Sequence, residues 1–227
     1  MTAMRQLFSA PRRPYYIDAP AYRRTSAGIR VLHLLCHALN SIGEEAYVYP
    51  TETHPALNTP LVTPELIERH RAAGREPIVV YPEVVRGNPR KAASVVRYVL
   101  NRAGLLGGDS AYADTELVFG FGLNALPEGA DPQNILFLPP IDTAIFNNLD
   151  NPLDTQRSGI LLYPGRHQAA LSQYPGLAAE ATLITYSWPE SHEALAELLR
   201  RSEVVYCFES TAIAAEAALC GCPAVIL

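Results

Sequence analysis

Strand and helix signals alternate along both halves of this chain of 227 residues. Short apolar runs that suit buried strands are separated by segments whose apolar residues recur at helical spacing. Strands that alternate with helices in this way pair in parallel, and the helices cover the faces of the resulting sheet. The pattern therefore predicts an α/β protein with two Rossmann-like parallel-sheet domains.

The first run of elements contains the clearest helix signal of the chain, over 27–41. Further helices are expected after Thr63-Pro64 and Asn88-Pro89, because each pair places a capping side chain before a proline at the first helical position. Gly74 and Gly104 are expected to close these two helices. The strands expected in this half cover 15–17, 46–49, 77–81, 116–119 and 135–138.

The second run predicts strands over 160–163, 182–186, 204–207 and 224–227. A helix is expected over 189–201, where Ser187 and Glu190 have the spacing of a capping box. A second helix is expected over 211–220, with Ser210 as its N-cap and Gly221 ending it. The segment 224–227 is apolar enough for a buried strand, and we expect the second domain to be incomplete at this point.

Domain boundaries follow from composition. The segment 141–158 is rich in Asn, Asp and Pro, which is typical of a linker. We expect a disordered arm over 1–14, an N-terminal Rossmann-like domain over 15–140, the linker over 141–158 and a C-terminal Rossmann-like domain over 159–227.

Charge and cysteine content exclude several classes of function. The net charge of −5 provides no general attraction to nucleic acid or to an anionic membrane. No segment is long and apolar enough to be an integral membrane span, and no feature indicates an oligomeric state. Four cysteines within apolar segments do not form the pattern of a secreted disulfide framework, so we expect reduced cysteines and a cytoplasmic location.

One acidic residue lies directly before the helix expected over 211–220, and a second lies within it. In open parallel sheets, ligands bind beyond the carboxyl ends of the strands, where helix N-termini favour anions. Glu209, Ser210 and Thr211 follow a predicted strand, and Glu216 returns to nearly the same helix face as Glu209. Carboxylates there can hold the hydroxyls of a ribose while backbone amides hold a diphosphate. The alternative is that Glu209 complements the helix dipole and that Glu216 is solvated.

Three further residues are candidates for binding or catalysis. Trp188 follows a predicted strand, where its ring suits either stacking on a base or sugar or anchoring the next helix to the sheet. Asp18 and His54 each follow a strand of the first half, and either suits the role of general base on an acceptor hydroxyl. No pattern of side chains indicates a metal site.

The segment 209–227, Glu-Ser-Thr-Ala-Ile-Ala-Ala-Glu-Ala-Ala-Leu-Cys-Gly-Cys-Pro-Ala-Val-Ile-Leu, resembles the nucleotide-sugar-binding segment of retaining glycosyltransferases with the GT-B fold. Gly165-Arg166 after a hydrophobic strand looks like the start of their C-terminal domain. The segment 26–43 resembles their first βαβ unit. The resemblance implies a GT-B-like arrangement in which the domain over 15–140 faces the acceptor and the domain over 159–227 binds the nucleotide sugar.

The same resemblance implies roles for individual residues. Glu216 would bind the ribose hydroxyls, and Glu209 would approach the donor sugar. The amides of Ser210 and Thr211 would lie near the diphosphate, whose charge Arg166 would neutralise. The donor would be a nucleotide diphosphate sugar, with no cofactor and no metal.

The expected activity is transfer of a sugar from this donor to a hydroxyl of a glycan or lipid-linked acceptor, in surface-glycan biosynthesis. One alternative is a non-catalytic or truncated GT-B-like binding or scaffold module. It is favoured by two departures from the family pattern: Glu209 and Glu216 lie one residue closer together, and His167 stands where a lysine commonly follows the arginine. A second alternative is a sugar-nucleotide epimerase of the same fold.

Overall fold

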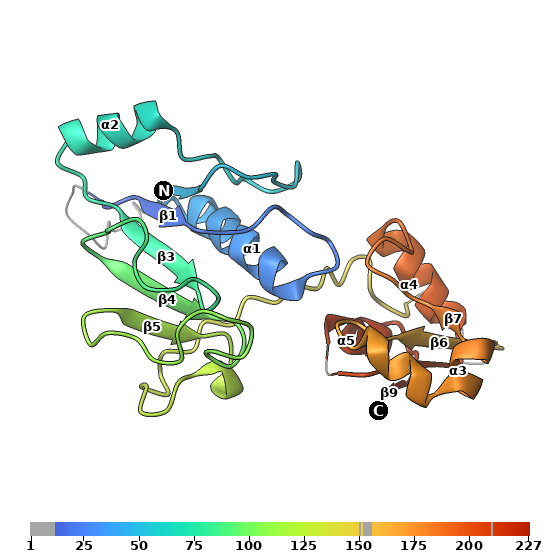
Figure 1. Ribbon diagram of the computed structural model, residues 1–227. Helices are drawn as coiled ribbons and strands as arrows, with labels where there is room; N and C mark the ends of the chain where they lie inside the picture. The colour runs from blue at the N-terminus through green and yellow to red at the C-terminus, as the bar shows by residue number, and fades with distance from the viewer. Residues whose placement is uncertain (1–11, 150, 152–155, 210) are drawn as a thin grey trace. The chain divides into compact units, whose positions relative to one another are not determined.

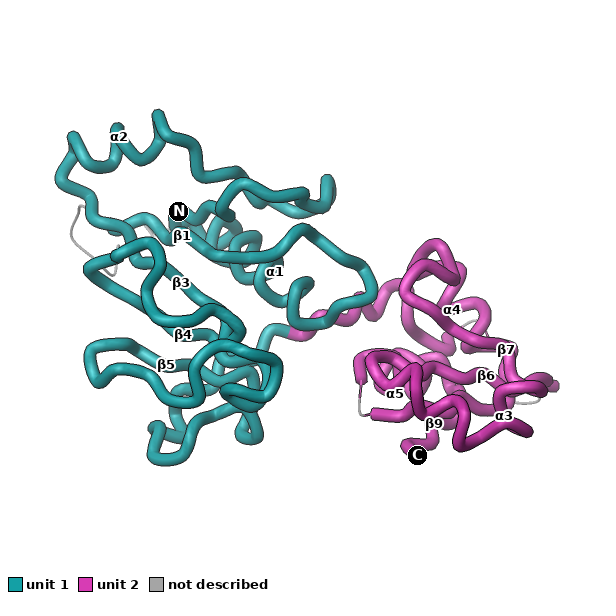
Figure 2. The backbone as a smooth tube through the Cα atoms, in the orientation of Figure 1, with its two compact units in different colours: residues 1–138 teal, residues 139–227 magenta. Residues whose placement is uncertain are grey.

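The computed structural model describes residues 12–149, 151, 156–209 and 211–227. The chain divides into two compact units, Met1–Leu138 and Pro139–Leu227, which we call the first and second units (Figure 2). Each unit contains a sheet whose strands pair in parallel, so the predicted α/β class is confirmed. Most of the expected arm over 1–14 lies outside the described residues, as do 150 and 152–155 of the expected linker.

The first unit is built around a parallel sheet with the strand order β2-β1-β3-β4-β5 (Figure 1). Its elements are β1 (Tyr15–Ile17), α1 (Ala27–Ser41), β2 (Ala46–Val48), α2 (Pro64–Ala72), β3 (Ile78–Pro82), β4 (Val95–Val99), β5 (Leu117–Gly120) and the short 3-10 helix η1 (Leu123–Ala125). The helix predicted over 27–41 is confirmed. The helix predicted after Thr63-Pro64 is confirmed too, since the Thr63 hydroxyl accepts a hydrogen bond from the amide of Leu66 (3.2 Å).

Alternate residues of the strands face opposite sides of this sheet, which creates two separate apolar cores. On one side, Ile17 and Val80 pack with Leu32 of α1. On the other side, Tyr16 and Val79 belong to a cluster with Leu66 of α2. The two helices therefore cover opposite faces, as the alternating pattern predicts.

The prediction of a helix after Asn88-Pro89 is wrong. The Asn88 side chain instead stabilises a turn. Its Oδ1 accepts a hydrogen bond from the amide of Ala92 (2.9 Å), and its Nδ2 donates to the carbonyl of Ala92 (2.8 Å). An asparagine side chain that bonds nearby backbone in this way competes with helix formation. The chain then extends into β4, whose sequence Val-Val-Arg-Tyr-Val consists mainly of residues that favour strands. The strand expected over 135–138 is reduced to one parallel bridge between Gly120 and Ile135.

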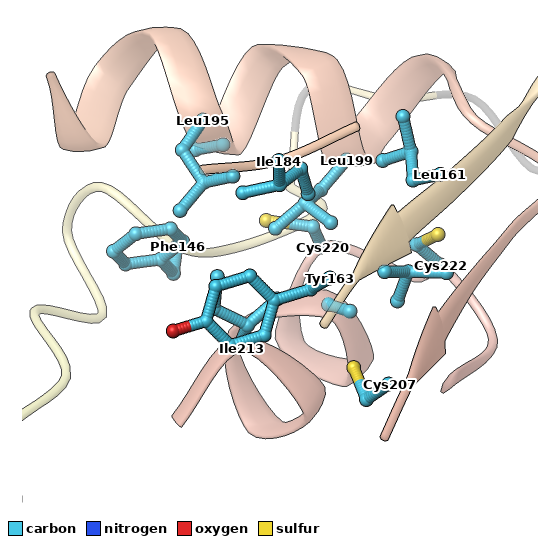
Figure 3. Close-up of a cluster of buried hydrophobic side chains, with 13 residues drawn as sticks. Phe146, Leu161, Tyr163, Ile184, Leu195, Leu199, Cys207, Ile213, Cys220 and Cys222 are labelled. Atoms are coloured by element: carbon cyan, nitrogen blue, oxygen red, sulfur yellow. The ribbon is translucent and has the colours of Figure 1, made fainter. Parts of the chain in front are cut away.

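The second unit has a parallel sheet with the strand order β7-β6-β8-β9. Its elements are β6 (Ile160–Tyr163), the 3-10 helix η2 (Gln168–Gln173), α3 (Pro175–Glu180), β7 (Thr182–Leu183), α4 (His192–Arg201), β8 (Val204–Cys207), α5 (Ala212–Leu219) and β9 (Ala224–Ile226). One face of the sheet packs against α4 and α5 through a core that includes Leu161, Leu199 and Ile213 (Figure 3).

The segment expected as a linker over 141–158 contributes to the core of the second unit. Phe146 has no exposed surface and packs in that core (Figure 3). Arg200 of α4 donates hydrogen bonds to the carbonyls of Ile145 (2.6 Å) and Asn147 (2.8 Å). Arg157 donates to the carbonyls of Leu199 and Cys220 (3.1 Å each). Polar composition suggested a linker, but Arg200 binds two of its carbonyls and its own Arg157 binds carbonyls of the rest of the unit, which holds the segment against the unit.

Local hydrogen bonds also move two boundaries in the second unit. Helix α4 begins after Ser191, whose hydroxyl accepts from the amide of Ala194 (3.1 Å), so the capping box at Ser187 is wrong. The strand expected over 182–186 ends at Leu183, because the Thr185 hydroxyl accepts from the amide of Trp188 (3.0 Å) and closes a turn.

The last predicted strand is present as β9 but is not buried. Val225 and Ile226 are 38% and 50% exposed. Their exposure follows from position, because β9 is an edge strand that pairs only with β8 among the described strands.

Candidate functional site

Two loops meet at the carboxyl edge of the sheet in the second unit. Strands β6 and β8 are neighbours, with Tyr163 paired to Cys207, so the loops that follow them leave the sheet side by side. Arg166 follows β6 and Glu209 follows β8. The Arg166 Nε lies 3.1 Å from Glu209 Oε2, and its Nη2 also contacts this oxygen. The parallel pairing therefore brings together two residues that the sequence separates by 43 positions.

Gly165 allows the two loops to approach. Its φ of +55° lies in the left-handed region, which side chains other than glycine rarely adopt. A Cβ at this position would lie 2.6 Å from Glu209 Oε1. The backbone amide of Arg166 donates to the same oxygen (3.3 Å). The glycine thus provides both the turn and the space that the carboxylate occupies.

Glu209 is held as an anion. Burial by itself raises the pKa of its carboxyl, but the hydrogen bonds and the positive charge of Arg166 outweigh burial, so the pKa lies below its usual range. Its side chain is 16% exposed, whereas that of Arg166 is 46% exposed. The Nε2 atom of His167 lies 3.8 Å from Glu209 Oε2. Such a carboxylate suits the binding of hydroxyl groups better than the donation of a proton.

Aromatic side chains surround this edge. Tyr163 is buried and packs edge-to-face on Tyr186, with ring centroids 6.4 Å apart. Tyr174 packs on Phe208, with centroids 5.3 Å apart. Trp188 is 41% exposed and has no contact with Arg166 or Glu209 among the interactions of the described residues. Phe208 directly precedes Glu209, and Tyr163 lies three residues before Arg166, so one aromatic pair packs beside each loop.

Helix α5 follows Glu209 and begins after Thr211. The Thr211 hydroxyl accepts from the amide of Ile213 (3.1 Å), so Thr211 is the N-cap, and the assignment of this cap to Ser210 is wrong. Ser210 itself, expected to contribute a diphosphate-binding amide, lies outside the described residues. Glu216 is 2% exposed, so it is not a solvated residue of an amphipathic helix.

Asp18 and His54 lie in the first unit. Asp18 follows β1, and its Oδ2 forms an ion pair with Arg90 (3.1 Å). His54 packs on Tyr22, and its Nδ1 accepts from the amide of Ala56 (3.3 Å). No interaction among the described residues joins Asp18 to His54. The structure therefore gives each candidate base its own surroundings rather than a shared site.

Sequence reasoning missed a buried network in the first unit. The Tyr16 hydroxyl lies 2.6 Å from His70 Nδ1, and His70 Nε2 lies 2.9 Å from Glu45 Oε1. Tyr16 and His70 are each 2% exposed. The contacting residues are 54 and 25 positions apart in the sequence, so no local spacing reveals them.

Comparison with known proteins adds no assignment, since no family model and no curated protein matches this chain. Among the described residues, no group of three or more His, Cys, Asp or Glu could hold a metal ion, and no helix is long and apolar enough to cross a membrane. All four cysteines lie in the described ranges and are buried without disulfides. Any proposal for the function therefore rests on the fold class and on the sheet edge that carries Arg166 and Glu209.

Proposed function

We propose that this protein is a GT-B-type glycosyltransferase whose second unit binds a nucleotide diphosphate sugar. The observation that carries the proposal is the pairing of Arg166 with Glu209 at the carboxyl edge of a parallel sheet, directly before helix α5. This edge is where open α/β sheets bind ligands, and a helix N-terminus there favours a diphosphate. The surface-glycan context and the glycan or lipid-linked acceptor rest on the resemblance alone.

Arg166 is proposed to neutralise charge on the leaving diphosphate. Its Nε and Nη2 bind Glu209, and the guanidinium carries further N–H groups. Its side chain is 46% exposed, so a ligand can reach it. Arginine suits this task because its planar fork binds phosphate oxygens in pairs. As the bond to the sugar breaks, the positive charge stabilises the developing negative charge of the nucleotide.

Glu209 and Glu216 are proposed to bind hydroxyl groups of the donor. The anionic Glu209 accepts hydrogen bonds, which suits hydroxyls of the sugar. Glu216 would bind the ribose, and its burial on α5 distinguishes it from an acid that is simply solvated on a helix surface. The amide of Thr211 at the start of α5 would donate to the diphosphate, and Trp188 would stack on the base. Asp18 or His54 would act as general base on the acceptor hydroxyl.

Calorimetry with UDP, GDP and dTDP tests the donor site. We expect one of the three to bind, and Arg166→Gln to weaken binding about tenfold or more, as expected when a charge-assisted hydrogen bond to phosphate is lost. Arg201→Gln is the matched control, because Arg201 is an exposed arginine on α4 that pairs with Glu197. Glu216→Gln should also weaken binding while retaining the helical circular dichroism signal.

Failure of all three nucleotides to bind, or equal affinities for the Arg166→Gln and Arg201→Gln variants, would refute the proposed donor site. The second candidate function is a non-catalytic module of the same fold. It is favoured by the geometry of Arg166, whose charge is already balanced by Glu209 in the structure. Nucleotide binding without hydrolysis or transfer of any nucleotide sugar would support this alternative.

A further inference from the structure

We propose that the first unit contains a second ligand site, a cavity that binds the phosphate group of a small phosphorylated organic molecule. The cavity has a volume of about 430 Å³. Its walls come from the strand residues Tyr16 and Val79, from the end of α2 at His70 and Arg71, and from the turn that carries Arg90 and Lys91. None of these residues belongs to the donor site proposed above.

The fold explains why this face of the sheet is hollow. Helix α2 connects β2 to β3 and packs on the face that carries Tyr16 and Val79 (Figure 1). The next crossover, from β3 to β4, contains the Asn88 turn instead of a second helix. One helix therefore covers this face, and the residues of the turn line the remaining space.

The charged side chains that line the cavity are mostly cationic. Among the described residues of the lining, four of these side chains carry a positive charge, and Glu76 is the only carboxylate. The cations are Arg71, Arg75, Arg90 and Lys91. Their carboxylate partners, including Asp18 and Glu45, are not part of the wall. Among the described residues, the Lys91 ammonium has no hydrogen bond or ion pair, so an anion can satisfy it.

Two guanidinium groups in the lining are already ordered by contacts within the protein. Arg90 donates through Nε to Asp18 Oδ2 (3.1 Å), and its Cζ lies 3.6 Å from the centre of the Tyr49 ring. Arg75 donates to Glu45 Oε2 (2.5 Å) and to the carbonyl of Arg12 (2.7 Å). Binding therefore does not need to order these two long side chains, which removes a usual cost of association.

The back wall of the cavity is fixed by the network of Tyr16, His70 and Glu45. His70 Nε2 lies 2.9 Å from the ionised Glu45 carboxylate, and the Tyr16 hydroxyl lies 2.6 Å from His70 Nδ1. These contacts hold the end of α2 against the sheet. The cavity is thus formed before a ligand arrives, as is usual for small-molecule sites.

The size and the apolar part of the wall point to an organic phosphate. Ile67, Val79, Ala92 and Ala93 contribute apolar surface, which an inorganic anion does not use. The volume lies within the range of about 300–1,000 Å³ that is typical of sites for small organic ligands. The cations would bind the phosphate, and the Tyr49 ring and the apolar residues would contact the organic part.

Calorimetry on the full chain tests the site with glucose 6-phosphate as the probe, beside inorganic phosphate, glucuronate and glucose. We expect glucose 6-phosphate to bind most tightly and neutral glucose not to bind. Lys91→Gln should weaken binding about tenfold, and Lys91→Glu should weaken it further, because the ammonium loses its charge or has it reversed. Lys91 is exposed, so both variants should keep the melting temperature of the wild type.

Arg86→Gln is the matched control, since Arg86 is an exposed cation in the same crossover that does not line the cavity. Arg166→Gln, in the second unit, should bind glucose 6-phosphate with the affinity of the wild type. Equal affinities for the Lys91→Gln and Arg86→Gln variants, or binding that depends on Arg166, would overturn the site. Tighter binding of glucuronate, or equal binding of inorganic phosphate, would overturn the assignment to an organic phosphate.

Discussion

Replacing Glu45 by glutamine should change how the stability of the protein depends on pH. Burial by itself raises the pKa of this carboxyl, but hydrogen bonds from Tyr47, Arg75 and His70, together with the charge of Arg75, outweigh burial and lower the pKa to about 2. Glutamine keeps the shape of the side chain and removes the charge. The variant therefore isolates the electrostatic contribution of the network.

The size of the effect follows from the shift in pKa. A fall in pKa from the usual value of 4.5 to about 2 corresponds to an upper limit of about 3.5 kcal/mol, at about 1.4 kcal/mol for each pH unit. The Glu45 side chain is 34% exposed, so solvent screening reduces the expected contribution to about 1–2 kcal/mol. Because the pKa is lower in the folded state, this stability is present above the unfolded pKa and is lost as the pH falls towards about 2.

Urea denaturation at pH 7, 4 and 3 measures the effect. We expect Glu45→Gln to lower the free energy of unfolding by about 1–2 kcal/mol at pH 7, and by about half of that amount at pH 3. Glu68→Gln is the control, because Glu68 and Arg71 form an exposed ion pair on helix α2. If wild type and Glu45→Gln lose stability in parallel between pH 7 and pH 3, the network does not hold Glu45 as described.

Three further substitutions test the described packing. Arg97→Met removes a guanidinium that is 1% exposed and leaves its partner Glu116 unpaired, so urea denaturation should show a loss of about 3–5 kcal/mol; a loss below about 1 kcal/mol would contradict the buried pair. Gly165→Ala forces a left-handed conformation and crowds Glu209, so stability should fall by about 1–2 kcal/mol, whereas Gly176→Ala should be close to neutral. Thr211→Ala should cost about 1 kcal/mol in a thermal melt while Thr211→Ser retains the cap; equal melting temperatures would refute the capping role.

Local pattern was sufficient to predict the fold class and most elements. Helix α1 and the strands β6 and β8 have the predicted bounds, because helical and strand periodicities are properties of a few consecutive residues. The prediction after Asn88-Pro89 was wrong because a proline preceded by a capping residue is common to helix starts and to turns. The side chain of Asn88 forms two hydrogen bonds with the backbone of Ala92, and these bonds stabilise a turn instead of a helix.

The pattern of the chain singled out Glu209, and the family resemblance singled out Arg166, but the sequence contained no sign that the two residues pair with each other. Their contact depends on β6 and β8 being neighbours in the sheet, which is a property of strand order. The cationic cavity has the same origin, since α2, the strand face and the Asn88 turn come from separate parts of the chain. Short-range periodicity reports which face of an element is buried, whereas only the packing of elements determines which distant charges meet.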